Sequence, residues 1–215
     1  MVKIAPSLLA CDFSRLGEEV KSVCDAGADY LHIDVMDGKF VNNISFGFPI
    51  ISSLRDKTHI KFDVHLMIEE PIRYTERFAA AGADIITVHA EACSNIEATL
   101  ASIKKCGAVP GLSVKPGTSA EDIFPYLDMC GLILVMTVEP GYGGQALIPY
   151  TLDKIKQIRK VLDERGCDAL LEADGGINSV NAAQVISAGA DILVAGSAVF
   201  KAADRAAAIS ALRQA

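Results

Sequence analysis

The sequence contains no tryptophan, and aromatic residues occupy only 6% of its 215 positions. No apolar run approaches the roughly 20 residues that a membrane-spanning helix needs. Twenty lysines and arginines face 27 acidic residues, which gives a formal net charge of -7. The chain therefore lacks the basic surface typical of proteins that bind nucleic acid or an anionic membrane, and we expect neither partner.

Cysteine occurs six times, but never as a Cys-x-x-Cys pair or in a closely spaced framework. Buried free thiols in a reducing compartment are therefore expected in place of disulfides. The N-terminal residues lack the apolar core and the cleavage site of a signal peptide. From these two absences we expect a cytoplasmic protein.

What the sequence does contain is a repeat. Ala-Gly-Ala-Asp occurs at residues 26–29, 81–84 and 188–191, each time between a helical pattern and an apolar run. The glycine fits the left-handed position that ends a helix, and Gly107, Gly131 and Gly166 occur in the same setting. The apolar run fits a strand buried on both faces. The repeating unit is thus a strand and a helix, about 27 residues long.

Eight such units fit into the chain. Strands are expected to begin near Lys3, Tyr30, Ile60, Asp84, Val109, Leu132, Ala169 and Asp191, and helices near Ser14, Phe48, Pro71, Asn95, Ala120, Pro149, Val180 and Ala203. Ser14 is a suitable N-cap, and the helices near Phe48 and Ala120 are expected to be short. With 51% hydrophobic residues and no linker, residues 1–215 are expected to form a single-domain (β/α)8 TIM barrel of the α/β class. A doubly wound open sheet is the alternative, but the glycine fingerprint of that fold is missing after the first strand.

The residues with reactive side chains lie where the strands should end, which is where barrels carry their chemistry. The two-residue period of a strand puts His32 and Asp34 on one face, and Asp63 and His65 on one face of the next strand. Asp174 precedes a glycine pair in a later strand. His32, Asp34, His65 and Asp174 could hold a divalent ion or supply an acid/base pair. Each could instead be a satisfied polar core residue, but burying two carboxylates together without a cation is costly.

Glycine-rich segments follow three neighbouring strands, at residues 139–145, 174–177 and 195–200. Backbone N–H groups of such loops bind phosphate without a basic side chain, and barrels often place this site after strands seven and eight. Three adjacent loops favour a phosphate site over simple tight turns. Met36, Met67 and Met136 also lie near strand ends, where they either pack the core or cover the metal site.

Taken in order, these segments are similar to those of the ribulose-phosphate 3-epimerase family, which the chain resembles along nearly its whole length. The matching segments are residues 5–9, 32–38, 63–67, 140–145, 172–177 and 196–197. The resemblance implies a metal-dependent isomerase of the pentose phosphate pathway, in carbohydrate metabolism, that interconverts D-ribulose 5-phosphate and D-xylulose 5-phosphate. It implies a small-molecule sugar phosphate as partner and a homo-oligomer of undetermined order.

The resemblance also assigns residues to roles. It implies that His32, Asp34, His65 and Asp174 bind one divalent ion, with zinc favoured over manganese or iron(II), and that Asp34 and Asp174 are the catalytic acid/base pair. The substrate-binding residues that it implies are Ser7, His65, Gly141, Tyr142, Gly143, Gly144, Asp174, Gly175, Gly176, Gly196 and Ser197. The family pattern His-Phe-Val-Pro-Asn is replaced at residues 39–43 by Lys-Phe-Val-Asn-Asn, which leaves the shape of that loop open.

The carboxylates suggest a mechanism. Inverting a carbon next to a ketone requires removing its proton and returning one to the opposite face, which one ionised and one protonated carboxyl group can do through an enediolate. An epimerase for a six-carbon ketose phosphate such as allulose 6-phosphate is an alternative, although Gly144 favours the pentose enzyme. A Schiff-base aldolase that uses Lys115 and a non-catalytic sugar-phosphate-binding barrel also stay open. Related decarboxylases are disfavoured because Asp-x-Lys-x-x-Asp is absent.

Overall fold

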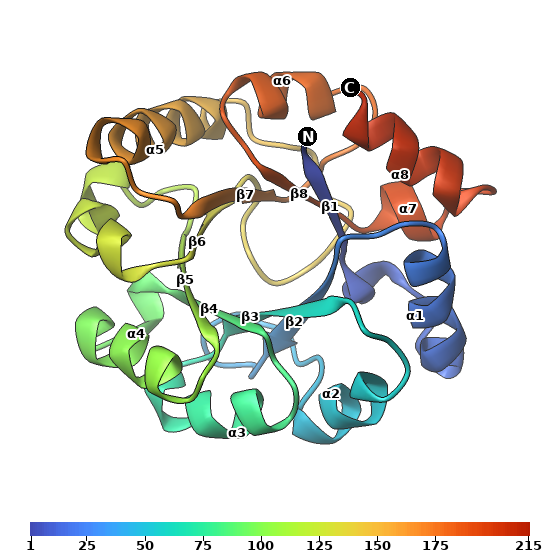
Figure 1. Ribbon diagram of the computed structural model, residues 1–215, viewed down its shortest axis with the longest axis horizontal. Helices are drawn as coiled ribbons and strands as arrows, with labels where there is room; N and C mark the ends of the chain where they lie inside the picture. Colours follow the sequence, from blue (N-terminus) through green and yellow to red (C-terminus); the bar gives the residue numbers. More distant parts are fainter.

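The computed structural model describes residues 1–215 and shows eight parallel strands curved into a barrel, with helices around the outside (Figure 1). The strands are β1 (Lys3–Pro6), β2 (Tyr30–Met36), β3 (Lys61–Met67), β4 (Ile85–His89), β5 (Val109–Val114), β6 (Leu132–Met136), β7 (Leu170–Asp174) and β8 (Ile192–Ala195). Each strand from β2 to β7 pairs with the strand that follows it in the sequence, and β8 pairs with β1. A bridge between Ser7 and His32 joins β1 to β2. The expected barrel is confirmed, and the open doubly wound sheet is wrong.

The helices follow the strands in alternation. The α-helices are α1 (Leu16–Asp25), α2 (Phe48–Arg55), α3 (Thr75–Ala80), α4 (Ile96–Lys105), α5 (Thr151–Arg165), α6 (Ala182–Ser187), α7 (Ser197–Phe200) and α8 (Arg205–Arg213). Short 3-10 helices are η1 (Leu8–Ala10), η2 (Phe13–Arg15), η3 (Pro71–Arg73) and η4 (Ala90–Ala92). The segment after β5 is a longer 3-10 helix, η5 (Ala120–Met129), which contains Pro125, a residue without the N–H group that an α-helical turn requires.

One expected helix start is wrong. The Ser14 side chain does not cap α1, because the chain first forms the 3-10 turn η2, and its cap is Asp12. The Asp12 carboxylate accepts from the Ser14 backbone N–H at 3.0 Å. Consequently α1 begins only at Leu16.

The glycines of the repeat adopt the expected left-handed conformation, with φ of +89° at Gly27, +108° at Gly82 and +114° at Gly189. Gly131 does not, so the expectation is wrong there. A Cβ at Gly131 would lie 2.5 Å from Cγ1 of Val109, so close packing calls for glycine at this position.

The aspartate of each repeat ties a strand to a helix. Its carboxylate accepts the backbone N–H of the neighbouring strand at 2.7–2.9 Å and pairs with an arginine from a surrounding helix or chain end. The three pairs are Asp29 with Arg213, Asp84 with Arg55, and Asp191 with Arg159. These charge-assisted bonds hold the starts of the strands in register, which explains why the repeat keeps an acid there.

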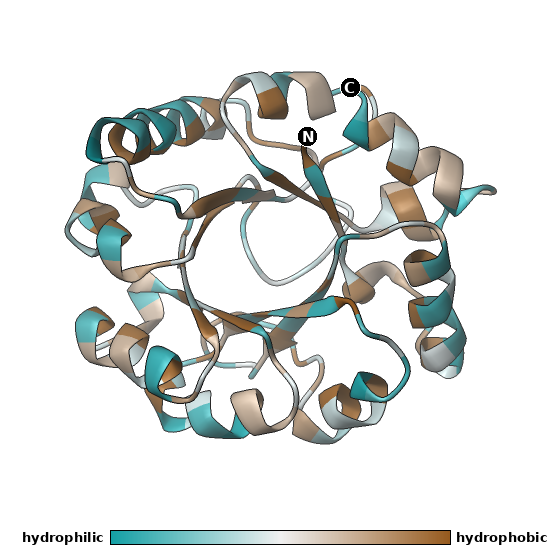
Figure 2. Cartoon of the chain, viewed as in Figure 1, coloured by the Kyte–Doolittle hydropathy of each residue, from teal (hydrophilic) through white to brown (hydrophobic).

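Two apolar layers surround and fill the barrel. Leu31, Ile33 and Val35 of β2 face outward into a cluster of 47 buried residues between sheet and helices. Brown hydrophobic colour runs along the strands in Figure 2, whereas teal gathers on the outer helices. A smaller inner cluster of nine residues comes mostly from β6, β8 and their neighbours. A third cluster, of Met36, Val41 and Met67, lies near the strand ends. Buried polar side chains such as His32, Asp63 and Glu172 lie in the interior as well, so the barrel provides a buried polar region beside apolar ones.

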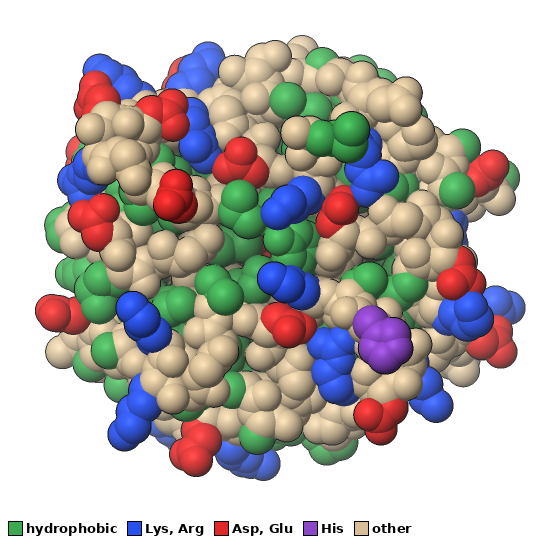
Figure 3. All heavy atoms as spheres, in the orientation of Figure 1, with side chains coloured by type: hydrophobic (Ala, Val, Ile, Leu, Met, Phe, Trp, Pro, Cys, Tyr) green, Lys and Arg blue, Asp and Glu red, His purple; other side chains and the backbone are tan.

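All six cysteines are free thiols. Only Cys130 is buried, so the expectation of buried thiols is wrong for the other five, which are partly exposed. No helix combines the length and the apolar character needed to cross a membrane. On the face of the molecule seen in Figure 3, acidic and basic side chains are interspersed around a more apolar centre.

Candidate active site

A pocket of about 800 Å³ opens where the strands end. Its wall includes residues at the ends of β1, β2, β3, β6, β7 and β8. In Figure 1 the loop after β6, drawn in yellow, is seen across the barrel opening. The pocket is therefore built from the carboxyl ends of parallel strands, the place expected for the chemistry of a barrel.

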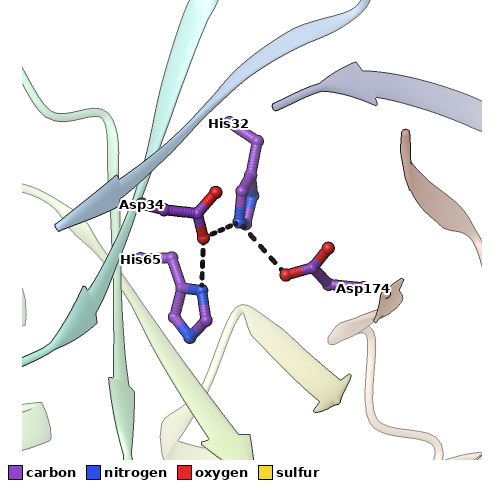
Figure 4. Close-up of side chains that lie close together, drawn as sticks. All are labelled: His32, Asp34, His65 and Asp174. Atoms are coloured by element: carbon purple, nitrogen blue, oxygen red, sulfur yellow. Dashed lines mark hydrogen bonds and ion pairs between the residues drawn. The ribbon is translucent and has the colours of Figure 1, made fainter. Parts of the chain in front are cut away.

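The four residues expected to hold a metal lie close together (Figure 4). Asp34 and Asp174 line the pocket, and His32 and His65 are fully buried beside them. Their candidate ligand atoms all lie within 4.8 Å of one another. Oδ1 of Asp34 is 3.3 Å from Nε2 of His32 and 3.1 Å from Nδ1 of His65. Oδ2 of Asp174, from the other side of the barrel, is 3.8 Å from the same His32 nitrogen. The structure thus brings together residues from β2, β3 and β7 that lie up to 142 positions apart in the sequence.

The donor atoms fit a divalent cation. Nδ1 of His32 lies 2.6 Å from Oδ2 of Asp63, and since a carboxylate only accepts, this nitrogen carries the hydrogen. Nε2 of His32 is buried without any hydrogen-bond partner, so in the neutral ring its lone pair is free for a cation. Without a cation, burial acts to lower the pKa of His32, but the charges of Asp34 and Asp63 outweigh it and raise that pKa well above its usual value. Two imidazole nitrogens and two carboxylates are a donor set that zinc, manganese and iron(II) accept. The cluster could therefore hold a divalent metal ion.

The two aspartates have opposite electrostatic surroundings. Burial acts to raise the pKa of Asp34, but the charges and hydrogen bonds of His32 and His65 outweigh it and leave that pKa below its usual value. Burial and the nearby charge of Asp34 raise the pKa of Asp174 to about 6. Ser7 also donates from Oγ to Oδ2 of Asp34 at 2.6 Å. Among the protein groups, Asp34 is thus the ionised carboxylate and Asp174 the one that more readily carries a proton.

Most residues expected to bind substrate line the pocket. They are Ser7, Gly141, Tyr142, Gly143, Gly144, Asp174, Gly175, Gly176, Gly196 and Ser197. His65 does not, because its side chain is fully buried behind the pocket wall. A Cβ on Gly176 would lie 2.4 Å from the backbone N of Leu147, so the loop after β7 packs directly on the loop after β6. Met36, Met67 and Met136 also line the pocket and are almost fully buried, so they pack the core and keep water from this end of the site.

The loop after β2, whose shape the sequence left open, folds over the same end of the barrel. The Asp37 carboxylate accepts from the backbone N–H groups of Lys39, Phe40 and Glu69. Nδ2 of Asn43 donates to the carbonyl oxygen of Gly141 at 2.8 Å. This bond joins the loop after β2 to the loop after β6.

Comparison with known proteins agrees with this geometry. A model of the Ribulose-phosphate 3 epimerase family matches residues 3–200. The chain belongs to the ribulose-phosphate 3-epimerase family. It is therefore an enzyme, an isomerase, which excludes the non-catalytic barrel.

Relatives in this epimerase family cover the chain almost completely. The ribulose-phosphate 3-epimerase of Bacillus subtilis (strain 168) is 50% identical over 99% of both chains. The enzyme of that name from Synechocystis is 49% identical over 99% of this chain and 93% of its own, and the chloroplastic enzyme of Arabidopsis thaliana is 47% identical over 98% and 75%.

Solved structures show the shared fold. A 3-hexulose-6-phosphate synthase has a TM-score of 0.69 at 18% identity, over 99% of this chain and 98% of that one. Tryptophan synthase from Mycobacterium tuberculosis has a TM-score of 0.70 at 14% identity, over 99% and 91%.

Several buried groups beside the epimerase site were not expected from the sequence. Glu172 is fully buried with no partner for either carboxylate oxygen, and burial and the charge of Asp63 raise its pKa well above the usual value. Asp63 contacts His32 through the 2.6 Å bond, although the sequence pattern assigned it no role. Both lie two residues before a proposed ligand, His65 or Asp174, so the two-residue period of a strand was the signal that could have found them.

The lysine that lines the epimerase pocket is not the one that the sequence singled out. Nζ of Lys115 lies 3.9 Å from the centre of the Phe40 ring, and this lysine does not line the pocket. Lys115, the nucleophile expected for a Schiff-base aldolase, is therefore not placed to attack a substrate in this pocket. Lys201, to which the sequence pattern assigned no role, lines the pocket after α7.

Proposed function

We propose that this enzyme epimerises D-ribulose 5-phosphate and D-xylulose 5-phosphate at C3, with residues 1–215 acting as one catalytic domain. The observation that supports the proposal most strongly is the pair of carboxyl groups, Asp34 and Asp174, which both line the pocket. In the metal-free protein their surroundings move their pKa values in opposite directions. They stand on β2 and β7, on either side of a pocket large enough for a sugar phosphate. The family membership supports the same reaction.

The protein groups divide the reaction between them. Asp34, the ionised carboxylate, removes the C3 proton from one face of the sugar. Asp174, in its protonated form, delivers a proton to the other face, so that an enediolate of the sugar lies between the two steps. In the reverse direction the roles exchange. Ser7 holds Asp34 in position through the hydrogen bond to Oδ2.

A metal would be held by His32, Asp34, His65 and Asp174, and we propose zinc, with manganese or iron(II) as the other candidates. When bound, the ion supplies Lewis-acid stabilisation of the negative charge that develops on the substrate oxygens. His32 and His65 present lone pairs to it because their other ring nitrogens are engaged elsewhere.

The phosphate would lie at the opposite end of the pocket. The loops after β6, β7 and β8 converge there with Gly143, Gly176 and Ser197 on the pocket wall. Their backbone N–H groups can bind a phosphate dianion without a dedicated basic side chain.

The test is an epimerisation assay with ribulose 5-phosphate and allulose 6-phosphate in parallel, before and after chelation, with elemental analysis of the purified protein. We expect turnover of the pentulose phosphate, its loss on chelation, and one ion per chain that His32→Ala and His65→Ala both remove. Preference for the hexulose phosphate would overturn the substrate, and unchanged metal content in both variants would overturn the site.

A further inference from the structure

Behind the pocket, a chain of hydrogen-bonding groups continues from the proposed ligand His65 toward the edge of the barrel. Nε2 of His65 lies 2.9 Å from Nε2 of His89 at the end of β4. Nδ1 of His89 lies 3.3 Å from Oε2 of Glu91 in η4. Both imidazoles are fully buried, whereas 22% of the Glu91 side chain is exposed. None of the proposed steps uses His89 or Glu91.

Glu91, at the outer end of this series of hydrogen-bonding groups, is held by further contacts. Oε1 of Glu91 accepts from the backbone N–H of Lys115 at 2.8 Å and also from the Thr118 hydroxyl. The Phe40 ring packs on His89 with 4.9 Å between ring centres. These contacts leave the carboxylate and the His89 ring little freedom to turn.

The geometry allows only a limited set of proton positions. Two facing imidazole nitrogens 2.9 Å apart share one hydrogen, since two N–H groups would repel. A carboxylate only accepts, so Nδ1 of His89 carries a hydrogen and donates it to Glu91. If His89 is neutral, its Nε2 then accepts from Nε2–H of His65. In a neutral His65, this arrangement leaves the lone pair on Nδ1. That nitrogen lies 3.1 Å from Oδ1 of Asp34, a contact in which a bound cation would take the place of a shared proton.

We propose that His89 and Glu91 are positioning residues that fix His65 in the tautomer whose Nδ1 is free to bind the metal. The proposal rests on the metal-ligand role of His65 given above. Removing a partner that orients a ligating histidine typically weakens metal affinity 10- to 100-fold. We therefore expect the pair to act through metal affinity and not through contact with the sugar.

The test uses His89→Leu, which removes the acceptor, and His89→Gln, whose side-chain oxygen can still accept from His65. Metal affinity is measured by competition with a chelator, and the tautomer of His65 by ¹⁵N NMR of the metal-loaded and the metal-free protein. We expect about 10- to 100-fold weaker binding in His89→Leu, substantial rescue in His89→Gln, and an increased share of the Nδ1–H tautomer of His65 in the metal-free His89→Leu protein. Glu91→Gln should weaken binding several-fold, and it serves alone if His89→Leu does not fold.

Glu69→Gln is the matched control, because Glu69 is a partly exposed carboxylate that pairs with Lys39. It should leave metal affinity unchanged. Wild-type affinity in folded His89→Leu and Glu91→Gln would overturn the positioning role while leaving the metal site standing. If His65→Ala also bound metal like the wild type, the proposed metal site itself would fail, and the positioning role with it.

Discussion

At the scale of single residues, the site depends on making two chemically identical side chains behave differently. Asp34 lies between His32 and His65, which favour its charged form, whereas Asp174 has Asp34 itself as a nearby charge. A pair of carboxyl groups with separated pKa values can serve as base and acid at the same pH. The difference comes from neighbours contributed by β2 and β3.

We predict that Asp34→Asn and Asp174→Asn each lower the rate of epimerisation by at least about 100-fold, the lower end of what a positioned acid or base contributes. The remaining carboxylate should still exchange the C3 hydrogen of one epimer with heavy water without inverting it, which NMR of the recovered sugar detects. Both residues are proposed ligands, so metal content is measured first. A metal-replete Asp174→Asn enzyme with a normal rate would falsify the two-carboxylate mechanism.

His89 provides a second residue-scale prediction. Burial lowers the pKa of His89 to about 4, below the value of 6.5 for an unperturbed histidine. Between these two pH values the unfolded chain binds more protons at His89 than the folded protein does. The free energy of unfolding is therefore highest above pH 6.5, and the contribution of the neutral His89 is lost as the pH falls through 4. Relative to His89→Gln, the wild type should lose up to about 3 kcal/mol of unfolding free energy across this window.

The measurement is urea unfolding of both metal-free proteins at several pH values. Groups that do not contact His89 titrate alike in the two proteins and cancel in the difference. His65 and Glu91 contact His89, so the difference reports the three groups together. If the free energies of unfolding of the two proteins changed with pH in parallel, protonation of His89 would not destabilise the folded state.

At the scale of elements, the proposed phosphate end of the pocket depends on loops packing backbone against backbone. Gly176, with φ of +68°, lies against the segment around Leu147, and Asn43 ties the loop after β2 to Gly141. The loops after β2, β6 and β7 therefore support one another. A side chain introduced among these loops should weaken binding of the sugar phosphate more than it lowers the stability of the barrel.

We predict that Ser197→Glu, at the first residue of α7, raises KM for the sugar phosphate by about tenfold or more, because a carboxylate close to the phosphate dianion costs about 2 kcal/mol or more. The kcat should change much less. Ser52→Glu, an exposed position on α2 outside the pocket, is the control and should leave KM unchanged. Equal KM values in the two variants would move the phosphate away from α7.

At the scale of the whole molecule, the polar interior of the barrel opposes folding wherever a buried polar group lacks a partner, as Glu172 does. The outer cluster of 47 apolar residues supports strands that carry His32, Asp34, Asp63, His65 and Glu172 inside. Two carboxylates and a neutral acid in one region oppose folding unless something balances them. A bound cation would do so.

We accordingly predict that chelation lowers the melting temperature. An ion present at about 1,000 times its Kd stabilises the folded state by about 4 kcal/mol, which corresponds to a shift of roughly 10 °C for a protein of this size. Differential scanning calorimetry with and without chelator measures it. His32→Ala, which lacks a ligand, should show no such shift, and an equal shift in that variant would place the stabilising ion elsewhere.

The sequence by itself determined the repeating unit and much of the site. Apolar runs buried on both faces, glycines such as Gly27 after helices, and the two-residue period of strands are local properties, and they predicted eight strands with His32 and Asp34 on one face. The predicted strand starts lie within one residue of those observed. The cap at Asp12 and the packing at Gly131 were missed, because each depends on a local turn or a neighbouring strand that periodicity does not encode.

Only the tertiary structure decided which polar groups meet across the barrel. The contacts of Asp63 with His32 and of His89 with His65 join side chains from neighbouring strands, and the approach of Asp174 to His32 spans the interior. Such distances depend on the register of the eight strands and on closure between β1 and β2, neither of which a single strand specifies. Local sequence pattern therefore identifies the proposed ligands, while closure of the barrel determines their surroundings and the separation of the two aspartate pKa values.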